Sequence, residues 1–568
     1  MSLFIFSAAL GLFATAGAVR RQAGQTGIDF QPCQELNNNI TRINGVEGTT
    51  FECATLNVPL DYTDLSSRPL ELDLFRVPAT EEPVLGSVLI NFGGPGGTGA
   101  ENLPAYAANA RNVIGAQWHL VSWDPRGTGN TIPFQCDVSA VAGITVPSRK
   151  RDELGNLVST NTTEVFLEGA WQSAGQVADA CYAQNREDET ATLIGTAFVA
   201  RDIMEIVDAL DEDGLLRYYG WSYGTALGSY VAAMFPDRVE SMVLDANVNP
   251  YDYRAGHYGK WTSDTDEAFQ GFIQTCYNAT DDCDLYTLLQ PDSPQDILDA
   301  INLALTPFAR NATNGDQAYL AYLALKFSII NPLYFPRTWP MLASTIAELL
   351  NGSTSAPPSM ETYGTAENAI LGIRSGDATF IANSTEEYLP QVEYQSTISP
   401  GFSDIAYWPL WISAQWRIPA RERYWGVFKA TTKTPILYIN GEFDPATPLV
   451  NAYTSSKGFE GSVVLPHSGY GHGIFADPSE CVARYVRAYF KEGTLPDGGT
   501  RCEPDQSVVE VWRSAVRADE AAENSSTTGG SNATSSATPA ATNGAGRVRG
   551  SVALAIGAVV AVAVIGVL

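Results

Sequence analysis

The sequence is poor in positive charge and in histidine. Its 568 residues hold 34 Lys and Arg against 63 Asp and Glu, a formal net charge of −29, and only four histidines. A surface of this sign would repel the phosphates of nucleic acid, so a nucleic-acid partner is excluded. The low histidine count leaves few candidates for any chemistry that needs an imidazole. The 45% hydrophobic content, in a chain of this length, predicts a globular protein with a large core.

The N-terminus lacks the positive residues that usually open a secretory signal, but it has the other parts of one. An apolar stretch at residues 3–13 is too short to span a bilayer, and the small residues at 14–18 fit a cleavage site. We therefore expect residues 1–18 to be a signal peptide. Secretion implies an oxidising compartment, where the eight cysteines should form disulfides rather than bind metal. Nearness in sequence suggests the pairs Cys276–Cys283 and Cys481–Cys502 and leaves the other pairs open.

The C-terminus lacks a core-forming composition and ends without a charged residue. Residues 516–545 are assigned to a linker rich in Ser and Thr, a composition that cannot build a core. Residues 546–568 become small and apolar up to the last residue, which resembles a signal for a lipid (GPI) anchor; an uncleaved membrane helix is the alternative. Either interpretation places the rest of the chain outside the cell. Eight Asn-x-Ser/Thr sites agree with a secreted glycoprotein.

The strongest local signal is a Gly-x-Ser-x-Gly run at residues 220–224, centred on Ser222. An apolar approach at 215–219 predicts a buried strand, and helical spacing of apolar residues from Thr225 to Phe235 predicts a helix that Pro236 ends. A strand, a tight turn and a helix would hold Ser222 on a sharp elbow with its hydroxyl presented to substrate. The pattern therefore predicts the nucleophile of a serine hydrolase.

Such a serine needs a histidine as base and a carboxylate that orients it, and in this architecture the order along the chain is Ser, acid, His. Of the four histidines, only His467 and His472 come late enough. We favour His472, because the glycines on either side of it allow a loop to bend into the site. His467 directly follows a proline at a strand end and is expected to be structural.

Two carboxylates follow the predicted strand that precedes these histidines, at Glu442 and Asp444. Catalytic groups lie at the carboxyl ends of strands in open α/β sheets. We favour Asp444 as the acid because it stands before Pro445, clear of the strand.

A glycine-rich loop at residues 92–99 follows the predicted strand at 88–91. Backbone N–H groups in such a loop can stabilise an oxyanion, so Gly94 and Tyr223, the residue after the nucleophile, are the predicted oxyanion donors. The loop lacks the Gly-Lys-Ser/Thr ending of a phosphate-binding loop, which disfavours that alternative. The predicted chemistry requires no cofactor and no metal.

At this point the chain resembles a known family, the prolyl and tripeptidyl aminopeptidase branch of the α/β-hydrolases. The resemblance is carried by five segments that are similar to the family's entry strand, oxyanion loop, Asp-x-Arg-Gly-x-Gly turn, nucleophile elbow and acid–base region: residues 53–62, 91–99, 124–129, 220–224, and 441–448 with 471–473. The prolyl enzymes usually have His before Gly-Gly-Pro-Gly, whereas this chain has Phe92. That departure favours the tripeptidyl-like, secreted side of the family.

The resemblance implies an α/β-hydrolase fold, with a mostly parallel sheet, helices on both faces and a largely helical cap. We expect the first part of the core at 24–249, the cap at 250–428 and the C-terminal part of the core at 429–515. The predicted activity is removal of N-terminal residues or short peptides through a Ser-His-Asp triad and an acyl-enzyme. An aminopeptidase must bind a free α-ammonium, and the cap offers carboxylates such as Asp264, Asp266 and Glu267 without indicating which one.

The expected partners are therefore peptides with a free N-terminus, and membrane contact is expected only through the C-terminal anchor. The sequence leaves the oligomeric state open. Two alternatives remain at this stage: an esterase or lipase with the same triad, and an inactive cell-surface binding protein on the same fold.

Overall fold

The structure is a computed structural model that describes residues 27–33, 50–64, 66–137, 164–257, 259–311, 316–351 and 365–528. The predicted signal peptide and the predicted anchor signal lie outside these ranges. Within them, no helix combines the length and the apolar character needed to cross a membrane.

A nine-stranded sheet organises the molecule, in the order β1-β2-β3-β5-β4-β6-β7-β8-β9. The first three strands pair antiparallel with their neighbours, and β5 to β9 pair parallel. The strands are β1 (Gln31–Pro32), β2 (Glu52–Pro59), β3 (Pro69–Val77), β4 (Gly86–Asn91), β5 (Trp118–Trp123), β6 (Leu216–Trp221), β7 (Val239–Asp245), β8 (Leu437–Phe443) and β9 (Val463–Tyr470). This topology confirms the predicted fold class.

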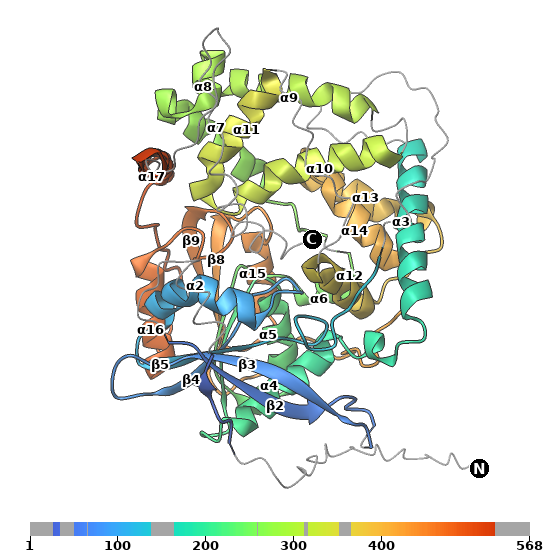
Figure 1. Ribbon diagram of the computed structural model, residues 1–568, viewed down its shortest axis with the longest axis vertical. Helices are drawn as coiled ribbons and strands as arrows, with labels where there is room; N and C mark the ends of the chain where they lie inside the picture. Colours follow the sequence, from blue (N-terminus) through green and yellow to red (C-terminus); the bar gives the residue numbers. More distant parts are fainter. Residues whose placement is uncertain are drawn as a thin grey trace, which may run out of the picture.

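The parallel strands are apolar runs because both faces of the sheet are covered. Val88, Leu89 and Ile90 of β4 are almost completely buried, as are Tyr218 and Tyr219 of β6. Helix α2 packs against α16, and α4 against α5 (Figure 1). The helices that cover the sheet are α2 (Gly99–Ile114), α4 (Thr196–Ala209), α5 (Tyr223–Met234), α15 (Leu449–Ser456) and α16 (Glu480–Glu492).

A layer of helices lies over one end of the sheet (Figure 1). Most of it is inserted between β7 and β8, as the sequence predicted for a largely helical cap: α6 (Pro250–Ala255), α7 (Thr265–Ala279), α8 (Asp284–Leu289), α9 (Pro294–Asn311), α10 (Asp316–Leu333), α11 (Trp339–Leu350), α12 (Thr365–Asp377), α13 (Thr385–Ile398) and α14 (Asp404–Ala414). Two helices from outside this insertion join the layer. Helix α3 (Glu164–Asn185) packs on α14, and α17 (Val508–Thr528) packs on α7 and α11.

Helix α17 corrects the start of the predicted linker, because residues 516–528 continue the helix. Two features explain where helix α17 begins and why it continues past residue 515. Its sequence from Ala515 to Asn524 is rich in Ala and Glu, which favour helix. The side chain of Trp512 is fully buried, and its indole Nε1–H donates a hydrogen bond to the carbonyl oxygen of Asp282 (3.0 Å). Packing against the cap therefore fixes the beginning of the helix.

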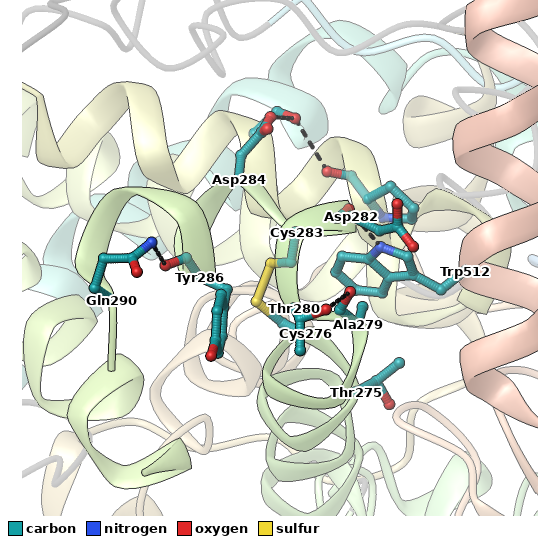
Figure 2. Close-up of a disulfide and its surroundings, with 12 residues drawn as sticks. Thr275, Cys276, Ala279, Thr280, Asp282, Cys283, Asp284, Tyr286, Gln290 and Trp512 are labelled. Carbon is teal, nitrogen blue, oxygen red and sulfur yellow. Dashed lines mark hydrogen bonds between the residues drawn. A yellow bond between two sulfur atoms is a disulfide. The ribbon is translucent and has the colours of Figure 1, made fainter. Parts of the chain in front are cut away.

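Four disulfides close loops in the described chain: Cys33–Cys53, Cys136–Cys181, Cys276–Cys283 and Cys481–Cys502. The last two confirm the pairs expected from nearness in sequence. Figure 2 shows Cys276–Cys283 at the end of α7, beside the indole of Trp512. The short loop closed by this bond carries Asp282, so it holds the residue that receives the Trp512 hydrogen bond.

The Asp-x-Arg-Gly-x-Gly turn after β5 places Arg126 inside the core. Its guanidinium forms two hydrogen bonds to the carboxylate of Asp202 on α4 (2.7 and 2.9 Å). Both side chains are fully buried. Arg126 also donates to the carbonyl oxygen of Pro59 (2.6 Å), and Tyr62 donates to Asp202 (2.8 Å). The turn thereby joins the end of β2 to α4, which is a structural role.

Candidate active site

Ser222 lies on a strained turn between β6 and α5. Its backbone adopts φ 59° and ψ −126°, a conformation that non-glycine residues rarely accept. The Ser222 N–H donates to the carbonyl oxygen of Asp245 at the end of β7 (3.0 Å), and its carbonyl accepts from the Thr225 N–H (2.8 Å). These bonds hold the elbow that the Gly-x-Ser-x-Gly pattern predicts.

His472 follows β9 and contacts Asp444, which follows β8. The imidazole Nδ1 lies 3.0 and 3.1 Å from the two carboxylate oxygens of Asp444. Asp444 also accepts hydrogen bonds from the backbone N–H groups of Ala446 (2.9 Å) and Thr447 (2.8 Å) and from the Thr447 hydroxyl (2.8 Å). An ionised carboxylate with these donors keeps the Nδ1 proton in place, so Nε2 is the basic atom of the imidazole.

The loop of His472 packs directly on the turn that carries Ser222. The imidazole lies 5.4 Å from the indole of Trp221, the residue before Ser222, measured between ring centroids. The Trp221 Nε1–H donates to the carbonyl oxygen of His472 (3.3 Å), and the His472 N–H donates to the carbonyl oxygen of Tyr334 in the cap (2.8 Å). Ser222 Oγ and His472 Nε2 are both buried, and neither has a hydrogen-bond partner in the described part of the chain.

The residues that the sequence set aside have other partners. Glu442 forms an ion pair with Arg501 (2.7 Å) and does not contact His472. His467 is buried within β9, and burial lowers its pKa to about 4, so it is neutral at physiological pH. His119 accepts a hydrogen bond from the Ala79 N–H (3.0 Å), and His257 packs against Phe380.

The glycine-rich loop after β4 lies against the elbow. Gly94 and Tyr223, the predicted oxyanion donors, both line a cavity that also contains Ser222. Gly93 comes even closer to the nucleophile turn. A Cβ atom on Gly93 would lie 2.6 Å from the carbonyl oxygen of Trp221 and 2.8 Å from Cβ of Ser222. The sequence indicated the loop but not this contact, because the approach depends on how β4 and β6 lie in the sheet.

Two charged side chains line the same cavity, Asp252 of α6 and Arg374 of α12. No pattern in the sequence pointed to either residue. Of the cap carboxylates named from the sequence, Asp264 accepts a hydrogen bond from the Leu449 N–H (3.2 Å), and Asp266 accepts one from the Gly401 N–H (3.4 Å). Neither these two nor Glu267, the third one named, belongs to the cavity lining. Asp252 could have been suspected only from its position shortly after β7, at the end of the sheet where Ser222 lies.

Asp245 is a second buried carboxylate near the site. It accepts hydrogen bonds from the Tyr219 hydroxyl (2.7 Å) and from the Ile474 N–H (3.1 Å). Burial raises its pKa to about 6. Because Ile474 lies two residues after His472, Asp245 fixes the histidine loop to β7. In the sequence, only the position of Asp245 at the end of a predicted strand could have indicated a role near the site.

Two known protein families match parts of the sequence. A family described as "alpha/beta hydrolase fold" matches residues 86–315, and one described as "TAP-like protein" matches residues 399–502. The fold is therefore that of the α/β-hydrolases, and residues 399–502 are similar to the TAP-like family.

The curated relatives agree on a serine hydrolase. "Serine protease Hip1" of Mycobacterium tuberculosis is 25% identical over 84% of this chain and 91% of its own length. "Tripeptidyl aminopeptidase" of Streptomyces lividans is 26% identical over 86% of this chain and 89% of its own. "Carboxylesterase B" of M. tuberculosis is 28% identical over 80% and 87%. Among solved structures, an epoxide hydrolase of Aspergillus niger aligns over 81% of each chain at 11% identity and a TM-score of 0.30, a likeness too low to carry an argument.

Proposed function

We propose that the protein is a secreted or cell-surface exopeptidase that removes N-terminal residues or short peptides. The observation that carries the proposal is the presence of Asp252 in the cavity that contains Ser222. A carboxylate at this place can bind the α-ammonium of a peptide by charge-assisted hydrogen bonds. The neighbouring ammonium of Lys260 favours the ionised form of Asp252, against the raised pKa that burial gives this group.

In the proposed mechanism, Ser222 Oγ attacks the scissile carbonyl carbon while His472 Nε2 removes its proton. The N–H groups of Gly94 and Tyr223 stabilise the tetrahedral oxyanion. The C–N bond then breaks as His472 returns the proton to the leaving amine, and an acyl-enzyme remains. Water, deprotonated by the same histidine, releases the N-terminal product and restores Ser222. Asp444 holds the imidazole in the required tautomer and stabilises it when it is protonated.

The disulfides support the extracellular part of the proposal. Four disulfides are typical of proteins from oxidising compartments. We also propose that the protein carries the predicted signal peptide, glycosylation and lipid anchor.

The test compares peptide anilides that have a free or an acetylated N-terminus. We expect wild-type kcat/KM to be higher for the free form by about 10-fold or more, because acetylation removes the charge that Asp252 binds. Asp252→Asn should lower this ratio towards one. The matched control is Asp281→Asn, which alters an exposed aspartate in the turn between α7 and α8, and Ser222→Ala should abolish both activities.

The second candidate is an esterase, favoured by the relative named carboxylesterase B. Simple acyl esters belong in the same assay. Cleavage of esters without cleavage of free peptides, or equal cleavage of free and acetylated peptides, would refute the aminopeptidase proposal.

A further inference from the structure

The cavity beside Ser222 contains a buried positive charge that the proposed mechanism does not use. The side chain of Arg374 lines the cavity, and the residue is only 4% exposed. Asp252 is the other charged residue of the lining. The cavity therefore contains a carboxylate, Asp252, that can bind a cation and a guanidinium, Arg374, that can bind an anion.

The surroundings of Arg374 fix its position. Its guanidinium carbon lies 5.4 Å from the ring centroid of Trp261, a cation–π contact with another residue of the cavity lining. The charge of Arg374 also acts on Tyr334, whose ring lies 5.0 Å from the imidazole of His472. The guanidinium is thus held near the reacting groups rather than directed towards bulk solvent.

Helix α12, which carries Arg374, is anchored to the core one turn later. Asp377 is fully buried and accepts hydrogen bonds from the Thr196 N–H at the start of α4 (3.1 Å) and from the Tyr253 hydroxyl (2.8 Å). After the helix, the Thr379 N–H donates to the carbonyl oxygen of Arg254 in α6 (2.9 Å). Figure 1 shows α12 beside α6, between the sheet and the outer cap helices. The anchoring makes the position of the guanidinium a property of the fold.

We propose that Arg374 binds a carboxylate of the substrate, so that the preferred substrates are peptides with both a free N-terminus and a nearby carboxylate. A guanidinium forms paired hydrogen bonds to a carboxylate, and such bonds are stronger at a buried site such as that of Arg374. The inference rests on the proposed function, since Asp252 supplies the ammonium site. The carboxylate can come from an acidic side chain on the acyl side of the scissile bond or from the C-terminus of a short peptide.

The experiment measures kcat/KM for substrate pairs that differ only in one carboxylate. One arm compares Glu with Gln before the scissile bond in peptide anilides with a free N-terminus. The other compares tetrapeptides that end in a free carboxylate or a carboxamide, with products identified by mass spectrometry. Wild type should prefer the carboxylate member of one pair by about 10- to 100-fold, and the arm that shows it identifies the source.

Arg374→Met should abolish that preference, while Arg374→Lys should retain part of it because the charge remains without the paired geometry. Arg421→Met, which alters a half-exposed arginine paired with Asp61, should leave the preference unchanged. If Arg374→Met does not fold, the kcat/KM ratios of Arg374→Lys and of wild type for the same substrate pairs still test the inference. No wild-type preference in either arm, or a preference that Arg374→Met or Arg374→Lys keeps in full, would overturn the inference.

A failure of this inference can be distinguished from a failure of the proposed function. The ratios compare carboxylate with amide at a constant N-terminus, whereas the aminopeptidase proposal depends on free against acetylated N-termini. A variant that loses the carboxylate preference but keeps the free N-terminus preference would support both.

Discussion

At the residue scale, the site depends on a backbone approach that admits no side chain. Gly93 has φ +94°, a left-handed conformation, and lies against Trp221 and Ser222 of the nucleophile turn. A methyl group there would push the glycine-rich loop after β4 away from Ser222. Gly94, the proposed oxyanion donor, follows Gly93 directly, and such a donor must lie within hydrogen-bond distance of the developing charge, so a displacement of this kind would act on the proposed catalysis.

We therefore predict that Gly93→Ala lowers kcat/KM by about 10²-fold or more, the usual cost of losing an oxyanion donor. The control is Gly498→Ala, where an added Cβ would have no atom within 4 Å. Steady-state kinetics on a peptide anilide, together with a thermal melt of each variant, would check this. Unchanged kinetics in a folded Gly93→Ala protein would show that the loop does not contribute to catalysis.

Local sequence patterns predicted the backbone geometry around Ser222 and His472. The Gly-x-Ser-x-Gly run located the turn at Ser222, and the glycines beside His472 indicated a bent loop. Such patterns did not indicate Asp252 or Arg374, because the cavity draws its lining from several segments that are distant in sequence. No local pattern at either residue shows that their side chains share one space.

At the scale of elements, long-range pairs decide how the segments join. The Arg126–Asp202 pair is fully buried and links the turn after β5 to α4. The Arg417–Asp179 pair links the segment after α14 to α3, but its side chains are 49% and 68% exposed. Burial makes the first pair costly to break, while solvent weakens the second.

We predict that Arg126→Met destabilises the protein by about 3–5 kcal/mol, because Asp202 is left as an unpaired buried charge. The double variant Arg126→Met/Asp202→Leu should recover a large part of this loss. Arg417→Met should cost less than about 1 kcal/mol. Equilibrium denaturation of the four proteins would measure the differences, and equal effects of the two arginine substitutions would contradict the structural role of Arg126.

The family resemblance implied the mostly parallel sheet and the helical cap, and the helical spacing of apolar residues after Ser222 predicted α5. The sequence did not predict that α3 and α17 join the helical layer. Their contacts depend on which face of each helix meets the insertion, and that is a property of the folded chain.

At the scale of the whole molecule, the protein combines a large negative charge with several protonatable buried carboxyls. Burial raises the pKa of Asp124, Asp245 and Asp377 to about 6, and that of Asp264 and Asp477 to about 7. A carboxyl group with a raised pKa in the folded state binds more protons there than in the unfolded chain. Its stabilising contribution is complete below the unfolded pKa near 3.8 and is lost as the pH rises through the folded value.

The protein should therefore be more stable at about pH 5 than at about pH 7.5. Protonation also reduces the self-repulsion that goes with the net charge of −29. We expect the melting temperature to rise by a few degrees or more between these two conditions, since about 1 kcal/mol shifts it by roughly 2–4 °C in a large domain. Scanning calorimetry across the pH range would test this, and a maximum at or above about pH 7.5 would contradict it.

The central claim is that Ser222 is a nucleophile activated by His472. Labelling with a fluorophosphonate, followed by peptide-level mass spectrometry, tests it most directly, because the reagent reports the reactive serine without any assumption about substrate. The account predicts one adduct, on Ser222, whose rate of formation falls by at least about 10²-fold in His472→Ala and less in His467→Ala. Labelling of another serine, or a rate in His472→Ala equal to that of wild type, would contradict it.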